Sequence, residues 1–180
     1  MIMKMVGNKC DDLQVVIKNN DTVQINAGQP VVLSLDGTTT PDVVLPSTNG
    51  AAGAIYAQSY GVNLQNLAVG AVGRCTVWGF ANNVFFISQT RASSTNNWAT
   101  MAALSSGQYL TLDTVNNGFL TGVSTIQYVT ASTAATPTTS TVRPIAMAAQ
   151  SLASYASSAS ATSDTRTAIT YAIQAFVRFM

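Results

Sequence analysis

The stretch 67-LAVGAVGRCTVWGF-80 decides the fold class, because it sets a turn directly before a long apolar run. Gly70-Ala71-Val72-Gly73 has the composition of a tight turn, and residues 74–80 are rich in the β-branched and aromatic side chains that favour strands. A phosphate-binding loop would instead end in Gly-Lys-Ser/Thr and lead into a helix. The run therefore predicts a hairpin turn followed by a strand.

Short β-branched runs separated by turn residues lie on both sides of this stretch. Such closely spaced strands predict an all-β fold, a compact barrel or sandwich of short antiparallel strands. After the turn-forming pair Asn82-Asn83 comes another short run, 84–87, and Asn116-Asn117-Gly118 predicts a hairpin between 109–112 and 119–120. The other expected runs are 15–17, 22–25, 31–35, 43–45, 55–62 and 67–69.

The C-terminal third contains two segments for which both strand and helix fit the sequence. Apolar residues occupy every odd position from Ile169 to Phe179, which predicts a strand, although a helical stripe also fits the same residues. Residues 145–155 are rich in alanine and leave strand and helix both open. The Thr- and Ala-rich segment 130–141 is expected to be a loop.

Only 8% of the 180 residues are charged, against about 25% in an average soluble domain. Thr, Ser, Asn and Gln side chains lose less solvation than Lys or Glu when another protein covers them, which favours a chain that works in an assembly. The five arginines are scattered, so we expect no nucleic-acid partner. No run reaches the length of a membrane span, so no membrane partner is expected either.

Two parts of the chain are distinguished. Residues 1–12 show no periodicity and predict an extended N-terminal arm, while 13–180 form one domain. The lysines, Lys4, Lys9 and Lys18, all lie near the N-terminus and give that end a slight basic bias. They are read as solvated residues on a mobile tail or as contacts to an acidic partner surface.

No catalytic, cofactor-binding or metal-binding residues are predicted. Histidine and glutamate are absent, and the adjacent Asp11-Asp12 pair is read as solvated rather than catalytic. Asp36 and Asp42 could offer oxygen ligands to calcium, but they lack the Asp-x-Asp spacing of such sites. Cys10 and Cys75 are expected to remain unlinked, because the core suffices without a disulfide.

The two tryptophans have the most apolar area to offer a partner. Trp78 lies within a strand-like run, so it is expected in the core or at a subunit contact. Trp98 follows Ser93-Ser94-Thr95-Asn96-Asn97, which predicts an exposed loop and makes it the better candidate for a partner's pocket.

The order of these runs resembles the small β-barrel head decoration proteins of tailed bacteriophages. The resemblance rests on pattern and covers most of the chain from Pro30. The resemblance rests on 29-QPVVL-33, 60-YGV-62, the opening stretch, 107-GQYLTL-112 with 118-GFL-120, residues 145–149 and the terminal 176-FVRFM-180. It implies a compact barrel, a strand near residue 145, and homotrimers on a capsid surface.

These observations lead to a functional expectation. The chain is expected to be a non-enzymatic cement protein that binds the outer surface of an assembled phage capsid and stabilises it. Its partners would be the major capsid protein and two further copies of itself, and it would be made in the host cytoplasm. The expected contact residues are Ile2, Lys4, Met5, Lys9, Trp78 and Trp98.

Two alternatives remain. A receptor-binding or adhesion module of a phage fibre or bacterial appendage would share the Thr- and Asn-rich surface, but fibres usually carry repeats that this sequence lacks. A small β-barrel hydrolase or carbohydrate-binding domain is disfavoured, because paired acid and base residues are missing.

Overall fold

The computed structural model describes residues 12–34, 41–47, 59–90, 97–98, 103–113, 116–121, 145–154, 156, 158–159 and 168–179. Within these ranges the regular elements are all strands and no helix occurs, so the expected all-β class is confirmed. No helix in the described part of the chain is long and apolar enough to cross a membrane.

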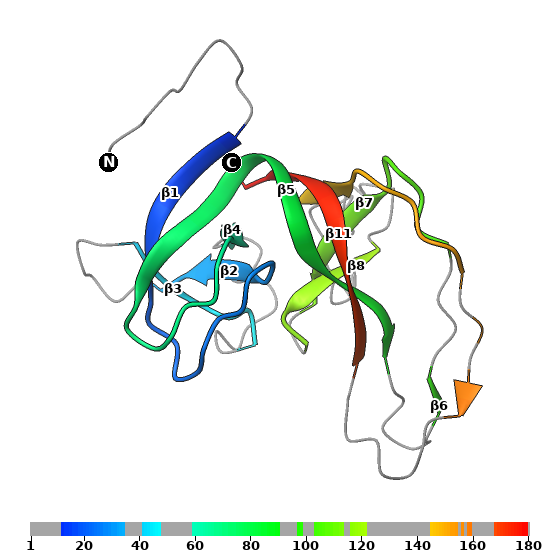
Figure 1. The fold of residues 1–180 in the computed structure, drawn as a ribbon, viewed down its shortest axis with the longest axis horizontal. Helices are drawn as coiled ribbons and strands as arrows, with labels where there is room; N and C mark the ends of the chain where they lie inside the picture. The colour runs from blue at the N-terminus through cyan, green and yellow to red at the C-terminus, as the bar shows by residue number, and fades with distance from the viewer. Residues whose placement is uncertain are drawn as a thin grey trace, which may run out of the picture.

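The described residues contain eleven strands, and Figure 1 labels most of them. Their bounds are β1 Asp12–Asn19, β2 Pro30–Leu33, β3 Asp42–Val44, β4 Ser59–Asn63, β5 Val72–Thr90, β6 Asn97–Trp98, β7 Tyr109–Asp113, β8 Gly118–Thr121, β9 Ala146–Ala148, β10 Ser158–Ala159 and β11 Ala168–Arg178.

Nine of these strands form one sheet that closes on itself twice. In the first ring the pairings run β1-β3-β2-β4-β5 and return from β5 to β1. In the second ring they run β5-β11-β9-β7-β8 and return to β5 through one residue pair, Phe86 and Phe119. The expected fold was a compact barrel or sandwich; the described strands do not form a clean barrel, but one sheet with two rings that share β5 (Figure 1).

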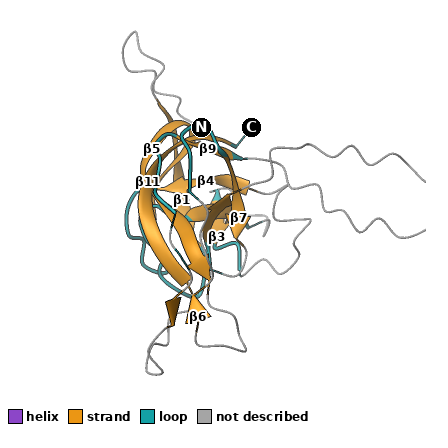
Figure 2. Ribbon diagram, turned by 90° about the vertical axis from the view of Figure 1, so that its right-hand side faces the viewer, coloured by secondary structure: helices purple, strands orange, loops and turns teal. Residues whose placement is uncertain are grey.

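The long strand β5 makes this arrangement possible. Its first part pairs with β1 on one edge and with β4 on the other, and its later part pairs with β11 along most of that strand. Figure 2 shows β5 and β11 running side by side as a curved pair. The expected strand at 169–179 is thus confirmed as β11, and its alternation holds, because Ile173, Ala175 and Val177 are buried.

The expected interruption at Asn82-Asn83 is not a turn between two strands. Asn83 has a φ of 59°, and the register between β5 and β11 shifts beside it, so the pair forms an irregularity within one strand. The loop after β1 fits against this point: the amide of Phe85 donates a hydrogen bond of 2.8 Å to the carbonyl of Gly28. The irregularity bends β5 where it passes from one ring to the other.

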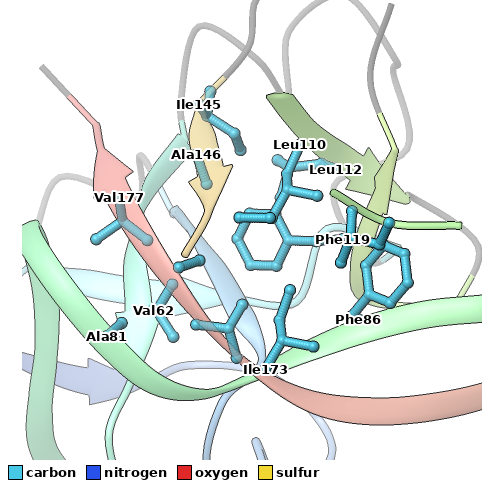
Figure 3. Packing of buried hydrophobic residues seen from close by; sticks show 14 of the residues in the cluster. Val62, Ala81, Phe86, Leu110, Leu112, Phe119, Ile145, Ala146, Ile173 and Val177 are labelled. Carbon is cyan, nitrogen blue, oxygen red and sulfur yellow. The ribbon is translucent and has the colours of Figure 1, made fainter. Parts of the chain in front are cut away.

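Each ring surrounds buried apolar side chains. The first cluster contains Ile17, Ile25, Val31, Val43, Leu45, Leu67, Cys75 and Val77. The second is built around Phe86, Leu110, Phe119 and Ile173 and also takes in Val62 of β4, so it extends beyond the second ring (Figure 3). Burial of this apolar surface is the main force that stabilises the fold.

Buried amides and carboxylates hold the loops of the first ring. The fully buried Asn19 donates from Nδ2 to the carbonyls of Val23 and Leu67, both at 3.0 Å, and accepts at Oδ1 from the amide of Asp21 at 2.8 Å. Asp21 in turn accepts at Oδ2 from the amide of Leu45 at 2.8 Å. These turn residues therefore satisfy backbone groups that would otherwise be buried without a partner.

Other predictions are resolved as follows. The Asn117-Gly118 hairpin is confirmed between β7 and β8, with Asn117 at a φ of 55°. The open choice at 145–155 resolves to strand at Ala146–Ala148. Asp12, assigned to the arm, is the first residue of β1, while residues 1–11 and the loop 130–141 lie outside the described residues.

Candidate interaction surface

Four side chains form a row across the outer face of the second ring. Phe80 of β5 lies opposite Phe176 of β11, Phe176 lies opposite Met147 of β9, and Met147 lies opposite Tyr109 of β7. Directly opposed residues on neighbouring strands point to the same face of a sheet. These four residues, here called the aromatic row, therefore lie side by side across four adjacent strands.

The aromatic row faces solvent. Phe80 is 58% exposed, Tyr109 43% and Met147 37%, and Phe176 is half-buried between its neighbours. Single exposed apolar residues are common on protein surfaces, but a contiguous set is typical of a contact surface. The row is thus the candidate site for a protein partner.

Aromatic contacts fix the shape of this surface. The Phe176 ring packs edge-on against Phe80 at a centroid distance of 5.3 Å and against Trp78 at 5.4 Å. The guanidinium carbon of Arg178 lies 5.7 Å from the centre of the Trp78 ring, a cation–π arrangement. The rings are therefore held in place by their neighbours, which lowers the entropy lost when a partner covers them.

An open groove of about 430 Å³ lies beside the row. Phe80, Phe176 and Met147 line it, together with residues of the turn at Ser106-Gly107. Gly107 in that turn has a φ of 85°, and a methyl group added there would meet nothing within 4 Å. The remaining lining residues are Ala148 and Ala149. An apolar side chain of a partner would fit this groove.

Exposed valines on the first ring differ from the row. Val72 is 57% exposed and Val16 is 54% exposed, but in the register of β1 and β5 Val72 lies opposite Lys18, and Val16 lies opposite Arg74. Charged neighbours interrupt the apolar surface there. Val72 therefore serves as a matched control for Phe80.

The two tryptophans that were predicted as contact residues differ in burial. Trp78 is half-buried and lies at the edge of the aromatic row, in contact with Phe176. The expectation that Trp98 itself lies on an exposed loop is wrong, because Trp98 belongs to β6, pairs with Ser158 of β10 and is only 4% exposed. Burying the indole within its own chain removes a large apolar area from water. The free energy gained in this way exceeds the preference of the neighbouring polar residues for a loop.

The remaining predicted contact residues, Ile2, Lys4, Met5 and Lys9, lie outside the described residues. Lys18, expected on a mobile tail, lies in β1 instead, and its Nζ is 3.8 Å from Oδ2 of the buried Asp42. Of the two aspartates considered as calcium ligands, Asp36 and Asp42, the first lies outside the described residues. Among the described residues no group of three or more metal-ligating side chains occurs.

The first ring contains one buried thiol. Cys75 is free, and burial raises its pKa to about 12. The neighbouring Tyr60 also has a raised pKa, first because of burial and second because of Cys75. A thiol with so high a pKa is protonated at neutral pH and is a poor nucleophile, so Cys75 is a packing residue of the first cluster.

Of the residues at this candidate surface, only Trp78 was predicted as a contact residue from the sequence. Trp78 was singled out for its size, whereas Phe80, Met147 and Tyr109 lie far apart along the chain. The signal that unites them is the cross-strand register, which one sequence does not provide. Comparison with protein-family models, with curated proteins and with solved structures finds no match to this chain.

Proposed function

We propose that this protein is a structural virion protein, a cement or decoration protein that binds the outer surface of an assembled phage capsid as a homotrimer and stabilises the shell. The observation that carries this proposal is the exposed aromatic row on a sheet with few charges. The order of the strand-forming segments resembles that of capsid decoration proteins. This resemblance is the reason for proposing a phage capsid as the partner.

The physical basis is the low cost of covering this face. Phe, Tyr and Met side chains gain free energy when a partner removes them from water, and aromatic residues are enriched among the residues that dominate binding. Charged residues lose strong hydration on burial, and here only 8% of residues are charged. The face of the second ring is therefore suited to packing against another subunit.

Stabilisation of a shell follows from bridging. A trimer that contacts several capsid subunits must lose all its contacts before those subunits separate, so weak contacts act together as one multivalent attachment. The expected effect is a shell that retains its DNA to a higher temperature.

The test compares virions with and without the protein. Particles lacking the gene, or stripped of the protein, should release DNA at a lower temperature than complete particles, and re-addition of the purified protein should restore retention. Labelling should place the protein on the head. Unchanged retention together with labelling on the tail would contradict the proposal and favour the adhesion alternative.

A pair of surface variants tests the role of the aromatic row. Phe80→Ser should reduce binding to stripped particles at least about tenfold, the loss expected for an aromatic anchor worth more than 1.4 kcal/mol. Val72→Ser, at a position of nearly equal exposure on the first ring, should leave binding unchanged. Equal losses in both variants would show that the row has no special role.

A further inference from the structure

The beginning of β1 lies next to one end of the aromatic row. Gly79 of β5 pairs with Asp12 of β1 on one edge and with Val177 of β11 on the other. Phe80, the first residue of the row, directly follows Gly79. The residues that precede Asp12 therefore enter the described structure beside Phe80, on the edge of β5 opposite to β11.

The segment before β1 has a composition that complements the row. Residues 1–6 read Met-Ile-Met-Lys-Met-Val, and Gly7-Asn8, a pair that favours turns, separates them from β1. Methionine is unbranched and makes favourable sulfur contacts with aromatic rings. Five apolar side chains in six residues thus stand within reach of an exposed aromatic surface.

Residues 1–6 are also long enough to cross the aromatic row. The row crosses from β5 to β7, which is three strand spacings, or about 14 Å. Six extended residues span about 20 Å. A turn at Gly7-Asn8 would let residues 1–6 run along the whole row.

We propose that residues 1–6 pack onto the aromatic row of their own chain, with the side chains of Met1, Met3 and Met5 against Phe80, Phe176 and Met147 and with those of Ile2, Lys4 and Val6 on the opposite, outward side. The short path from Asp12 to Phe80 favours the same chain over a second copy. The outward-facing Ile2 and Val6 then keep the combined surface of segment and row apolar, so that it remains suited to a partner. This inference concerns the free protein and does not depend on binding to a capsid.

The test is photo-crosslinking from the row in the full-length protein. With p-benzoylphenylalanine in place of Phe80, irradiation should join this residue to residues 1–6 within one chain, as identified by mass spectrometry of the monomer band. The same group in place of Val72, which is equally exposed on the first ring, should give no adduct with residues 1–6.

Other outcomes would overturn the proposal. Adducts only in a dimer band would assign the row to the segment of a second copy, and adducts only to other parts of the chain would exclude residues 1–6 as its occupant. Particle binding is not measured in this experiment, so failure of the capsid proposal would be seen separately.

A second measurement leaves Phe80 intact. Peroxide oxidation of Met147 in the free protein should become several-fold faster in the Met3→Ser/Met5→Ser variant, because the segment no longer shields the Met147 sulfur. Thr22→Ala, at an exposed position on the loop after β1, should leave the rate unchanged. Equal oxidation rates of Met147 in the wild-type protein and the Met3→Ser/Met5→Ser variant would contradict the proposal.

Discussion

Glycine is required at position 28 for two separate reasons. Its φ of 84° is a backbone conformation that L side chains rarely adopt, and a Cβ there would collide with the carbonyl oxygen of Asn83. Gly28 also receives the 2.8 Å hydrogen bond from the amide of Phe85 and donates one of 2.8 Å to the carbonyl of Asn63. A side chain at this position would push the loop away from β5.

Substitution of two glycines separates these effects. Gly70 has a similar φ of 75°, but a Cβ there would meet nothing within 4 Å. Gly70→Ala should therefore cost about 1–2 kcal/mol of unfolding free energy from backbone strain alone, whereas Gly28→Ala should cost about 3 kcal/mol or more. Urea denaturation measures both. Equal losses would mean that contact between the loop and β5 adds nothing to stability.

The buried thiol of Cys75 predicts a pH dependence of stability. Its pKa is raised from 9.0 in the unfolded chain to about 12, so the unfolded state loses its proton first as the pH rises. Stability should therefore be constant below about pH 8 and fall through the window from about 9 to 12. At pH 10 the expected loss from this group is about 1.4 kcal/mol.

The control for this prediction is Cys75→Ala. The variant is less stable at every pH because of the cavity it leaves, but it should lack the part of the alkaline decline that comes from the thiol. Tyr60 also titrates with a raised pKa and contributes to the decline in both proteins. Identical slopes in the wild type and in Cys75→Ala would refute the assignment.

At the scale of elements, β5 makes the two rings one folding unit. Its first part supplies Cys75 and Val77 to the first cluster, and its later part supplies Val84 and Phe86 to the second. A strand that carries side chains in both clusters cannot remain ordered when one of them is lost. Unfolding should therefore be a single cooperative transition.

Matched leucine truncations test this coupling. Leu67→Ala in the first cluster and Leu110→Ala in the second remove the same atoms from equally buried positions. Each should lower the free energy of unfolding by about 2–5 kcal/mol and shift one common transition. Hydrogen exchange of β7 amides should accelerate in Leu67→Ala. Two separate transitions would show that the rings unfold independently.

Some of these elements follow from local sequence, and others depend on contacts between distant parts of the chain. The hairpin at Asn117-Gly118 and the alternation of β11 were predicted, because turn chemistry and period-2 burial are local properties. The continuity of β5 through Asn83 was not predicted, because asparagine at positive φ suits a turn and a strand irregularity equally well. The loop that contains Gly28 contacts β5 beside this irregularity and favours it over a turn. Gly28 lies more than fifty residues before Asn83 in the sequence.

The candidate site shows the same division. Trp78 could be singled out by its size, but burial of Trp98 depends on a pairing between β6 and β10 that are about sixty residues apart. The aromatic row requires the register of four strands from four distant parts of the chain. Local patterns therefore predict that strands exist, and long-range register decides which side chains meet.

For the molecule as a whole, the low charge predicts an attachment that is insensitive to salt. Contacts between charged surfaces weaken strongly as salt is added, whereas burial of apolar side chains does not. Binding of the protein to stripped particles should change less than about threefold between 50 and 500 mM NaCl. A tenfold or greater loss over this range would indicate that charged groups, such as those of Lys4 and Lys9, dominate attachment.

The proposed trimer makes the final prediction. Three copies held together bring three contact surfaces to the capsid, so loss of one contact leaves the others to restore it before the trimer dissociates. Light scattering of the free protein should report about three times the chain mass of 18.8 kDa. If trimers form only on the lattice, chemical crosslinking of decorated particles should give a trimer band, and binding should be steeply cooperative in protein concentration.

Mixing in a minority of Phe80→Ser chains should then lower occupancy more than in proportion to their share, because one weakened subunit affects the retention of its two partners. A monomer in solution that binds particles without cooperativity, with occupancy falling only in proportion to the variant share, would leave the protein as a single-site binder and remove the multivalent explanation for shell stabilisation.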